Sequence, residues 1–492
     1  MKILQCASEV NPFVKTGGLA DVVGALSFEL SRRGHDVRIV LPLHGSIDRH
    51  KWPIRRVIDS MGVPLGYGEK WCSVYETTLP QSSAPVFLIE HDQYFGRSAL
   101  YQWDGEDYDD NAERFAFFSR ACCQLVKALH WSPDVIHAHD WQTALIPVYL
   151  KSWEADHPRL WSTASVQSIH NLGYQGVFPK DQILHSQLGW EHFHTGSLEF
   201  YDQINYLKAG ILFADKVSTV SPTYAHEIQT PEHGWALDGV LRSRSPDLVG
   251  ILNGCEYGEW DPSRDSRIPV QFDVDQPSGK KICKEELQRS FGLPIRPDVP
   301  IVGLVTRLAY QKGIDILASA IPSMMSMDMQ LVVLGAGEVW AHFYYGGLPS
   351  SYPGKIGSYI GYDDVRAHLI MAGSDFLLVP SRYEPCGLTQ LQSLRYGTLP
   401  IVRSTGGLND TVDQYDESTG GGDGFRFHDL SPRAIADTVG WGVSTYFDRP
   451  HHFAAMRDRA MRKRFLWSTG AEQYEHLFRW AIERKRGHYS PE

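Results

Sequence analysis

Short apolar runs alternate with longer amphipathic stretches through the first half of the chain. The short runs predict buried strands, and the longer stretches predict helices. The strands predicted here are 2–7, 36–41, 135–138, 165–169 and 217–220, and the helices are 19–33 and 111–128. Between 52 and 93, short β-like runs alternate with turn residues instead. Because a strand, a helix and a parallel strand form a βαβ unit, this half predicts a doubly wound α/β domain.

Residues 260–300 interrupt that rhythm. Pro, Asp, Arg and Ser follow one another in loose order there, around one predicted helix at 280–291, as in a linker. The alternation then restarts, with strands predicted at 301–305, 330–334, 355–360, 375–379 and 399–402, and helices at 313–325, 363–371, 389–396, 432–447, 451–465 and 471–484. The chain therefore predicts two Rossmann-like doubly wound domains, 1–255 and 256–465, that face a central cleft. The C-terminal helix, within 466–492, is expected to pack back on the first domain.

The second domain is organised around residues 380–390, the loop between the predicted strand 375–379 and the predicted helix 389–396. Open α/β sheets bind their ligands at such strand ends. Gly387 lets the backbone come close to a ligand, and the first free N–H groups of the helix favour an anion. Glu384 is therefore a carboxylate beside a predicted anion-binding helix start.

Arg307 and Lys312 stand in the turn that follows the predicted strand 301–305. Both could contact one anion near the end of that strand. From spacing alone, two solvated loop cations are the alternative. Together with Glu384 and the helix start at 387–389, however, these cations give one pocket three anion-binding elements. A diphosphate is the ligand that this arrangement favours.

Three further segments attract attention because of their composition. Residues 15–18 place a lysine beside two glycines without the G-x-G-x-x-G spacing, which suits a phosphate or a sugar ring better than a dinucleotide. The aromatic-rich loop at 94–108 is a candidate sugar-stacking surface, although ordinary packing is the favoured interpretation. Residues 420–424 are predicted to form a flexible glycine-rich loop, with a phosphate cradle as the alternative.

His137, His139, Asp140 and His170 lie at the ends of two predicted strands and raise the question of a metal site. Alternate residues of a strand share one face, so His137 and His139 could chelate an ion. No helix of the H-E-x-x-H kind accompanies them. A hydrogen-bonded structural histidine is therefore the favoured interpretation of His137 and His139, and no metal is expected.

The composition of the chain argues against some classes of binding partner. The 492 residues carry a formal net charge of −11, which argues against a general nucleic-acid or anionic-membrane binder. Seven scattered cysteines, an odd number without a C-x-x-C pair, are typical of free thiols in a reducing compartment. No stretch approaches the roughly 20 apolar residues of a membrane span. We expect a cytoplasmic protein without a membrane or nucleic-acid partner; the oligomeric state stays open.

Seven segments together carry a resemblance to a known family. They are 15–22, 137–141, 169–171, 251–254, 307–313, 380–390 and 405–408. In this order, and over about residues 2–478, the chain resembles the bacterial glycogen synthases and plant starch synthases. The start Lys-Thr-Gly-Gly-Leu combined with Glu-Pro-Cys-Gly-Leu is highly specific to them among the two-domain GT-B glycosyltransferases.

The resemblance implies transfer of α-glucose from ADP-glucose to the non-reducing end of an α-1,4-glucan such as glycogen, with retention at the anomeric carbon and with no metal or other cofactor. The implied catalytic residues are Asp140, His170, Arg307, Lys312 and Glu384. The implied donor-binding residues are Lys15, Gly17, Gly18, Asn253, Arg307, Lys312, Tyr362, Glu384, Cys386, Gly387, Leu388 and Thr389. The implied acceptor-binding residues are Asp21, Tyr94, Asn111 and Asp140.

Two alternatives remain at this point. The same fold could use UDP-glucose or another acceptor, because loop contacts choose the nucleobase. A catalytically silent glucan-binding protein is the alternative of another class. It is disfavoured because a binding module has no evident need for a cation pair at a leaving group. The sequence also leaves open whether Glu384 or Asp140 bonds covalently to the sugar, and front-face attack assisted by the departing phosphate is favoured.

Overall fold

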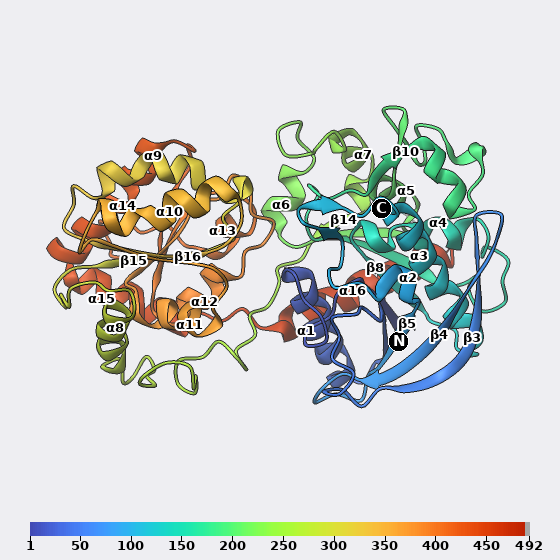
Figure 1. Cartoon of the computed structure of the whole chain (residues 1–492), viewed down its shortest axis with the longest axis horizontal. Helices are drawn as coiled ribbons and strands as arrows, with labels where there is room; N and C mark the ends of the chain where they lie inside the picture. The colour runs from blue at the N-terminus through green and yellow to red at the C-terminus, as the bar shows by residue number, and fades with distance from the viewer. Residues whose placement is uncertain (488–492) are drawn as a thin grey trace. The chain divides into compact units, whose positions relative to one another are not determined.

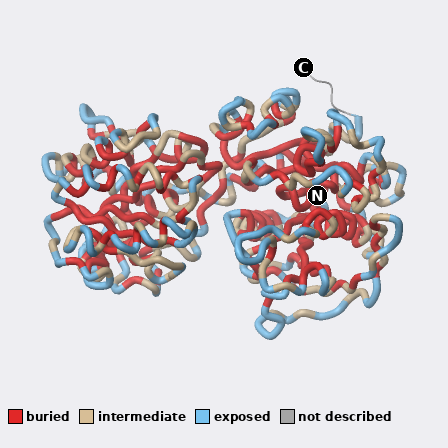
Figure 2. The backbone as a smooth tube through the Cα atoms, turned by 45° about the horizontal axis from the view of Figure 1, so that its top comes forward, coloured by how far each residue is buried: buried red, intermediate tan, exposed pale blue. Residues whose placement is uncertain are grey.

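The computed structural model describes residues 1–487 (Figure 1). The chain divides into two compact units. Unit 1 contains Met1–Gly254 and the chain from Trp467 onward, and unit 2 contains Cys255–Leu466. In each unit the central strands are buried and the connecting loops carry most of the exposed backbone, as Figure 2 shows.

Unit 2 is built on a six-stranded, fully parallel sheet with the order β17-β16-β15-β18-β19-β20. Its strands are β15 (Ile301–Val305), β16 (Gln330–Gly335), β17 (Ile356–Ile360), β18 (Phe376–Val379), β19 (Leu399–Arg403) and β20 (Phe425–Phe427). The chain runs outward in one direction from β15 and then in the other from β18. The loops that leave the C-terminal ends of β15 and β18 therefore diverge, which opens a crevice for a ligand there.

Helices cover both faces of this sheet (Figure 1). They are α8 (Gly279–Ser290), α9 (Ile314–Met324), α10 (Val339–Ser351), α11 (Asp364–Gly373), α12 (Thr389–Arg395), α13 (Gly406–Thr411), α14 (Pro432–Asp448) and α15 (Pro450–Arg462), with a 3-10 turn at Tyr310–Lys312. Leu317 of α9, Leu348 of α10 and Val439 of α14 pack in one core cluster with Leu304 and Leu331 of the sheet. The apolar side chains of α8 and α11 pack in a separate cluster on other strand residues. The unit therefore has the three layers of a doubly wound fold.

Unit 1 is built on a nine-stranded sheet with the order β14-β13-β9-β8-β1-β2-β5-β4-β3. Its strands are β1 (Lys2–Cys6), β2 (Asp36–Pro42), β3 (Arg55–Leu65), β4 (Gly68–Thr78), β5 (Pro85–Glu90), β8 (Val135–His139), β9 (Ala164–Ile169), β13 (Lys216–Thr219) and β14 (Leu248–Gly250). Only β4, next to the edge strand β3, runs antiparallel to its neighbours, which are β3 and β5. The direction of winding reverses between β1 and β8, so the ligand crevice is expected at their C-terminal ends.

The remaining elements of unit 1 surround this sheet. The helices are α1 (Gly18–Arg32), α2 (Asp92–Phe95), α3 (Asn111–Ala128), α4 (Leu145–Lys151), α5 (Tyr206–Phe213), α6 (Pro222–Glu227), α7 (Asp238–Ser243) and α16 (Trp467–Lys485), with 3-10 turns at Trp141–Thr143, Lys180–Ser186, Trp190–His192 and Ser245–Asp247. Small antiparallel strands are β6 (Gln102–Trp103), β7 (Glu106–Asp107), β10 (Val177–Pro179), β11 (Glu199–Phe200) and β12 (Gln203–Asn205). Together with the main sheet they complete an α/β unit.

Helix α16 is the last element of unit 1 although it follows unit 2 in the sequence. Ala471, Leu477 and Phe478 belong to the same core cluster as the side chains of α1 and β1. Glu475 of this helix accepts hydrogen bonds from Arg33 at 2.7 and 3.1 Å. The hydrogen bonds from Arg33 and His35, together with their charges, lower the pKa of the Glu475 carboxyl to about 2, against a smaller opposing effect of burial. The last helix is therefore fastened to α1 by an apolar face and an ion pair.

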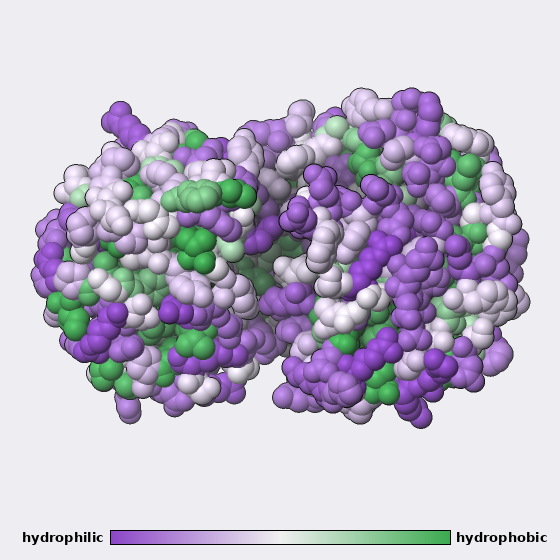
Figure 3. Space-filling model, viewed as in Figure 1, coloured by the Kyte–Doolittle hydropathy of each residue, from purple (hydrophilic) through white to green (hydrophobic). Residues whose placement is uncertain are grey.

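The surface of both units is predominantly hydrophilic, with scattered apolar patches on the face that Figure 3 shows. Among residues 1–487, no helix combines the length and the apolar character that a bilayer crossing requires.

Candidate active site

The loops after β15 and β18 bring a lysine and a glutamate of unit 2 together. Lys312 Nζ lies 2.6 Å from Glu384 Oε2, and Ser381 donates a hydrogen bond of 2.8 Å to the same oxygen. Glu384 is 6% exposed, so burial by the loop strengthens the attraction between the two charges. The residues that the sequence assigns to one pocket thus meet at the edge where the fold opens its crevice.

Arg307 is the second cation at this edge. Its guanidinium Nη2 donates to Gln311 Oε1 at 3.2 Å, and the residue is exposed. Within residues 1–487, no carboxylate lies within ion-pair distance of it. Gln311 in turn donates to the backbone oxygen of Tyr383, the residue before Glu384, at 3.4 Å. Arg307 therefore offers an uncompensated positive charge on the loop that carries Lys312, as an incoming anion requires.

The start of α13 supports the backbone of the 380–390 loop. The N–H of Gly407 donates to Glu384 O at 3.1 Å. A Cβ on Gly406, whose φ is +46°, would lie 2.0 Å from Glu384 O, and a Cβ on Gly407 would lie 2.1 Å from Cys386 O. Only glycine allows this approach. Gly387 itself, with a φ of +74°, turns the chain into α12. The loop that carries Glu384 is thus shaped by glycines on both of its sides.

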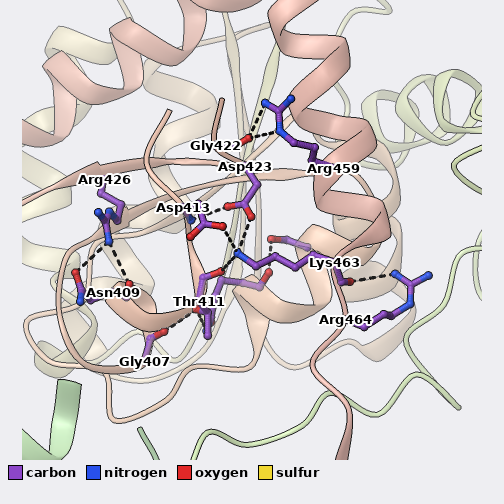
Figure 4. Close-up of polar contacts among 12 residues, drawn as sticks. Gly407, Asn409, Thr411, Asp413, Gly422, Asp423, Arg426, Arg459, Lys463 and Arg464 are labelled. Carbon is purple, nitrogen blue, oxygen red and sulfur yellow. Dashed lines mark hydrogen bonds and ion pairs between the residues drawn. The ribbon is translucent and has the colours of Figure 1, made fainter. Parts of the chain in front are cut away.

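The other end of α13 is anchored by charged side chains of unit 2 (Figure 4). Lys463 Nζ donates to Thr411 O at 2.9 Å, to Asp413 Oδ2 at 2.8 Å and to Asp423 Oδ2 at 2.7 Å. Arg426 donates to Asn409 Oδ1 at 3.1 Å. These contacts hold the helix whose first residues lie against Glu384. These contacts position the loop and do not supply groups that could contact a substrate.

The glycine-rich segment 420–424 presents carbonyl oxygens to a cation. Arg459 donates to Gly422 O from two nitrogens, at 2.9 and 2.8 Å (Figure 4). It also donates to Gly420 O. A phosphate cradle presents N–H groups instead. The structure therefore disfavours the phosphate alternative for this segment, and it shows an anchored loop where the sequence predicts a flexible one.

In unit 1, a chain of hydrogen bonds crosses the C-terminal ends of β1, β8 and β9. His139 Nε2 lies 2.8 Å from Gln5 Oε1, and His139 Nδ1 lies 2.9 Å from His170 Nε2. Because the Gln5 oxygen only accepts, His139 donates from Nε2 and accepts at Nδ1, so His170 donates from Nε2. His139 uses both ring nitrogens in this chain, which leaves neither for a metal.

Burial decides the charge of these groups. It lowers the pKa of His170 to about 4 and that of His139 well below its ordinary value, so both rings are neutral at pH 7. Burial also raises the pKa of Asp140 to about 7, against the lowering effect of backbone N–H groups, and His170 N donates to Asp140 Oδ1 at 2.7 Å. The site in unit 1 thus combines neutral, hydrogen-bonded histidines with a carboxyl group that titrates near pH 7.

Asp140 also has an unusual backbone. Its φ of +54° with ψ of −169° lies in a region that side chains rarely adopt, at a cost of roughly 1–3 kcal/mol. Such strain persists where surrounding contacts hold it, and it concentrates at functional sites. The backbone therefore adds an independent reason to place Asp140 in the chemistry.

The loop that carries Lys15 is held from one side by Glu9. Thr16 donates to Glu9 from its backbone N–H and, at 2.7 Å, from its hydroxyl, and Tyr101 donates to Glu9 Oε1 at 2.6 Å. Lys15 Nζ lies 2.8 Å from Asp21 Oδ2, with the lysine side chain half exposed. A Cβ on Gly17 would meet nothing within 4 Å. Lys15 and Gly17 thus lie on open surface at the end of β1, where a ligand can approach them.

Two family models match this chain, one in each half of the sequence. A family described as "Starch synthase catalytic domain" matches residues 2–243, and one described as "Glycosyl transferases group 1" matches residues 286–445. Glycogen synthase 1 of Geobacter sulfurreducens is 50% identical over 488 residues, which cover 99% of this chain and 97% of the relative. The chain belongs to the glycogen synthase family. Glycogen synthase of Treponema denticola, 45% identical over 99% of both chains, agrees with this assignment.

A solved structure gives the same result for the fold. The catalytic domain of starch synthase IV from Arabidopsis thaliana superposes with a TM-score of 0.90 at 30% identity and covers 98% of this chain. The sequence-based resemblance and the GT-B fold class are therefore confirmed, and the chain is a glycosyltransferase of the glycogen synthase family. Sucrose-phosphate synthase from Thermosynechococcus elongatus, at 16% identity and a TM-score of 0.59, shares the fold alone.

Several residues assigned from the family resemblance differ in accessibility. Tyr362, two residues before α11, is 88% exposed, so its ring is free to stack on a base. Cys386 is buried, whereas Gly387, Leu388 and Thr389 are half-buried at the start of α12. The buried Asn253 has an Oδ1 without a hydrogen-bond partner among the described residues. None of these placements tests the roles themselves, which stay predictions.

Tyr94 and Asn111 lie inside unit 1. The Tyr94 ring is fully buried and stacks on His91 at 4.1 Å between centroids, and its hydroxyl donates to Glu113. Asn111 donates to Tyr101 O at 2.9 Å and accepts from Arg114. Neither side chain presents a free face in this structure. Ordinary packing, the favoured interpretation of the aromatic loop, describes Tyr94, and an acceptor role for either residue would require the loop to move.

The sequence alone did not point to Gln5, Glu9 or Ser381. Gln5 interrupts an apolar strand, and Glu9 follows that strand within a few residues. A polar residue inside a buried strand needs a partner, so this pattern could have drawn attention to Gln5. Ser381 carries no such signal, because only the turn of the chain brings its hydroxyl to Glu384.

Proposed function

We propose that this glycogen synthase family member transfers α-glucose from ADP-glucose to the non-reducing end of an α-1,4-glucan, with retention of configuration and without a metal in the reaction. The observation that carries the proposal is the grouping of Arg307, Lys312 and Glu384 at the switch point of unit 2. When the bond to ADP breaks, negative charge grows on the distal phosphate. Two cations fixed beside it stabilise that charge more than they stabilise the intact donor.

Each unit has its own part in the proposed reaction. Unit 2 binds the donor: Arg307 and Lys312 contact the distal phosphate, Glu384 accepts hydrogen bonds from glucose hydroxyls, and Tyr362 stacks on the base. The backbone N–H groups of residues 386–389 bind hydroxyls and phosphate. In unit 1, Lys15, Gly17 and Gly18 contact the diphosphate and glucose of the same donor, as Asn253 does from the end of that unit. The acceptor glucan binds on unit 1, beside Asp21 and Asp140.

The hydrogen-bonding groups at the site of unit 1 suit a sugar. His170 and Asp140 lie at the end of one hydrogen-bonded chain, and the ring of His170 is uncharged at neutral pH. Such groups exchange hydrogen bonds with hydroxyls and offer no positive charge to a phosphate. In the proposed step the acceptor O4 attacks C1 on the face from which ADP leaves. The C1–O bond to phosphate breaks, and the O4 proton passes to the departing phosphate oxygen.

The nucleotide is chosen by analogy with a relative. Starch synthase IV from Arabidopsis thaliana is described as bound to ADP and acarbose. ADP is the fragment that ADP-glucose leaves behind after it transfers glucose, which supports the adenine nucleotide for this chain. The seven cysteines are buried and none of them forms a disulfide, which supports a reducing compartment, and we propose that the reaction takes place in the cytoplasm.

The test is incorporation of labelled glucose into glycogen, with ADP-glucose and UDP-glucose compared side by side, each with and without EDTA. We expect incorporation from ADP-glucose that persists in EDTA. Incorporation from UDP-glucose alone would overturn the donor while keeping the fold and the cation pair. Binding to glycogen without incorporation from either donor would instead indicate a silent glucan-binding protein.

A further inference from the structure

A second cluster of chemically active side chains lies in unit 2, among residues that the proposed reaction does not use. Glu259 belongs to the loop that opens unit 2, and Asp364 and His368 stand one turn apart on α11. One possible ligand atom of each lies within 4.8 Å of the others. It is the one group of three or more His, Cys, Asp or Glu side chains with metal-site spacing among residues 1–487.

The imidazole of His368 is fixed from two sides. Its side chain is completely buried, and its ring stacks on Trp260 with centroids 3.7 Å apart and planes 12° apart. Nδ1 lies 2.7 Å from Asp265 Oδ2, which also accepts a hydrogen bond of 2.6 Å from the Tyr396 hydroxyl. The ring therefore cannot turn without losing both the stack and the bond, and Nε2 lies on the side of Asp364.

The hydrogen bonds determine which nitrogen of His368 carries the proton. Both oxygens of Asp265 accept hydrogen bonds, Oδ1 from the backbone N–H of Arg267 at 2.9 Å and Oδ2 from the Tyr396 hydroxyl. Asp265 therefore acts as an acceptor, so Nδ1 of His368 donates to it. In the neutral ring, Nε2 then carries a lone pair. This atom is buried and has no hydrogen-bond partner within residues 1–487.

A lone pair directed at carboxylate oxygens is unfavourable unless a proton or a cation lies between them. The nearest carboxylate oxygen, Asp364 Oδ1, is 3.9 Å from Nε2, which is too long for a hydrogen bond. A metal ion between them would use the lone pair and both carboxylates. A histidine that donates its other N–H to a carboxylate is also the usual arrangement at metal sites, since that bond fixes the tautomer and raises the basicity of the ligand.

Arg267 neutralises only part of the negative charge in this cluster. Its Nε lies 2.8 Å from Asp364 Oδ2 and its Nη2 lies 3.0 Å from Glu259 Oε1. Within the cluster, Glu259, Asp364 and Asp265 bring three negative charges and Arg267 brings one positive charge. The sum of −2 is the charge that one divalent cation neutralises.

We propose that Glu259, Asp364 and His368 bind one Zn²⁺ ion, with His368 Nε2 and one oxygen of each carboxylate as ligands. Imidazole with carboxylates is a ligand set that zinc accepts, and solvent can complete the coordination. Ligand atoms around zinc lie roughly 3.3 Å apart, so the carboxylates close in on the fixed imidazole. Their partial exposure allows that movement. The ion fastens the loop of Glu259 to the first turn of α11, two residues after Tyr362.

The site is structural in this proposal and takes no part in glucosyl transfer. It is therefore compatible with a reaction that persists in EDTA. Because Tyr362 directly precedes the metal-bound turn, the ion fixes the segment from which that ring projects. The inference rests on the cluster alone and does not depend on the proposed function.

The test uses the full-length chain, stripped with EDTA and returned to metal-free buffer. Titration with Co²⁺, followed by its visible absorption, and with Zn²⁺, followed by calorimetry, is expected to give one ion per chain. Asp364→Asn and Glu259→Gln are each expected to weaken that binding at least tenfold, and Zn²⁺ is expected to raise the Tm of the unsubstituted chain but not of these variants. Asp363→Asn is the matched control, because this neighbouring carboxylate pairs with Arg366 and is not a ligand.

Equal Tm values of all variants without metal would show that the substitutions leave the fold intact. If a variant does unfold, Glu259→Gln, at a half-buried loop position, provides the decisive comparison. Absence of stoichiometric binding, or binding that neither Asp364→Asn nor Glu259→Gln weakens, would overturn the proposal. The second result would assign the ion to other histidines of the chain.

Discussion

The two units build their candidate sites at the same place in the same kind of sheet and give them opposite electrostatic character. In unit 1, the reversal between β1 and β8 gathers Gln5, His139 and His170 into a buried chain of neutral hydrogen bonds. In unit 2, the reversal between β15 and β18 gathers Arg307, Lys312 and Glu384, with a bare cation beside an ion pair. The strand order of the sheet determines where a ligand binds, and the side chains at that place determine which ligand binds.

The two sites differ in charge because their surroundings differ in how well they stabilise a charged group. A fully buried group loses its charge unless a partner holds it, which is why the histidines of unit 1 are neutral and Asp140 holds its proton to about pH 7. In unit 2, by contrast, Glu384 lies beside Lys312, and each charge of this ion pair stabilises the other. The first arrangement suits hydroxyl groups, and the second suits phosphate. The following experiments challenge that contrast.

Replacing Asp140 by Asn should have the largest effect, on the pH dependence of stability. The Asp140 carboxyl has a pKa of about 7 in the folded chain and about 3.8 in the unfolded chain. Below about pH 4 the carboxyl is protonated in both states, so it does not lower the free energy of unfolding. Between pH 4 and 7 the unfolded chain loses this proton first, and the folded state is penalised by a growing amount, about 4 kcal/mol above pH 7. Asp140→Asn should remove that penalty.

Chemical denaturation at pH 4, 6 and 8 measures the Asp140 prediction. The variant should match the unsubstituted chain at pH 4 and become more stable than it at pH 8, while losing activity. Asp59→Asn, at a carboxylate whose side chain is 93% exposed, should show no such trend. A constant difference at all three pH values would mean that Asp140 is ionised in the folded chain, and the contrast between the two sites would weaken.

Removal of the bare cation should have the next largest effect. Arg307→Ala should lower kcat about a hundredfold, about 3 kcal/mol in the barrier, by analogy with lost oxyanion donors. Stability should change little, because Arg307 is exposed and its described contact is the bond to Gln311. Steady-state kinetics and thermal unfolding provide the two readouts. Arg289→Ala, an exposed arginine of α8, is the control, and near-normal turnover of Arg307→Ala would exclude Arg307 from stabilising the leaving group.

Replacing Glu384 by Gln tests the ion pair of unit 2. The amide can still accept from Ser381, but it loses the charge that Lys312 and the glucose hydroxyls would use. We expect kcat to fall about 30-fold, about 2 kcal/mol, which is typical of a lost charge-assisted hydrogen bond. Glu286→Gln on α8 serves as the surface control. Turnover close to that of the control would remove Glu384 from catalysis.

The smallest effect is expected in the Lys15 loop of unit 1. Thr16→Val removes the hydroxyl that donates to Glu9 at 2.7 Å and keeps the shape of the side chain. Loss of one neutral-to-charged hydrogen bond should loosen the loop by about 1 kcal/mol and raise the KM for the donor about fivefold, with kcat nearly unchanged. Thr78→Val at the exposed end of β4 controls for the added methyl group. A change in kcat alone would mean that the loop acts in the chemical step.

Sequence reasoning succeeded where the local pattern was unambiguous. The strand predicted at 301–305 is Ile301–Val305, and the helix predicted at 111–128 is Asn111–Ala128. It missed α10, because two glycines and Pro349 inside Val339–Ser351 are helix-breaking residues. That helix forms nevertheless, since Tyr345 and Leu348 are buried against the sheet. Long strands β3 and β4 were expected only as short β-like runs, because cross-strand pairing extends them.

The candidate site divides in the same way. Arg307, Lys312 and Glu384 could be found from sequence, because charged residues and glycines at strand ends carry a local signal. Glu9 and Ser381 could not, since their partners Tyr101 and Glu384 become neighbours only in the folded chain. Gln5 carries the signal of a polar residue in a buried strand, but its partner His139 does not follow from the sequence. The burial that makes His170 neutral is likewise absent from any sequence pattern.

By itself the sequence determined the alternation of strands and helices, the family and the charged residues of unit 2, because each of these is written in local periodicity or in short motifs. The tertiary structure alone decided the protonation of Asp140 and His170, the glycine contacts beneath Glu384 and the grouping of Glu259, Asp364 and His368. Those features depend on burial and on distances between residues far apart in the chain. Packing creates both, and no local pattern encodes them.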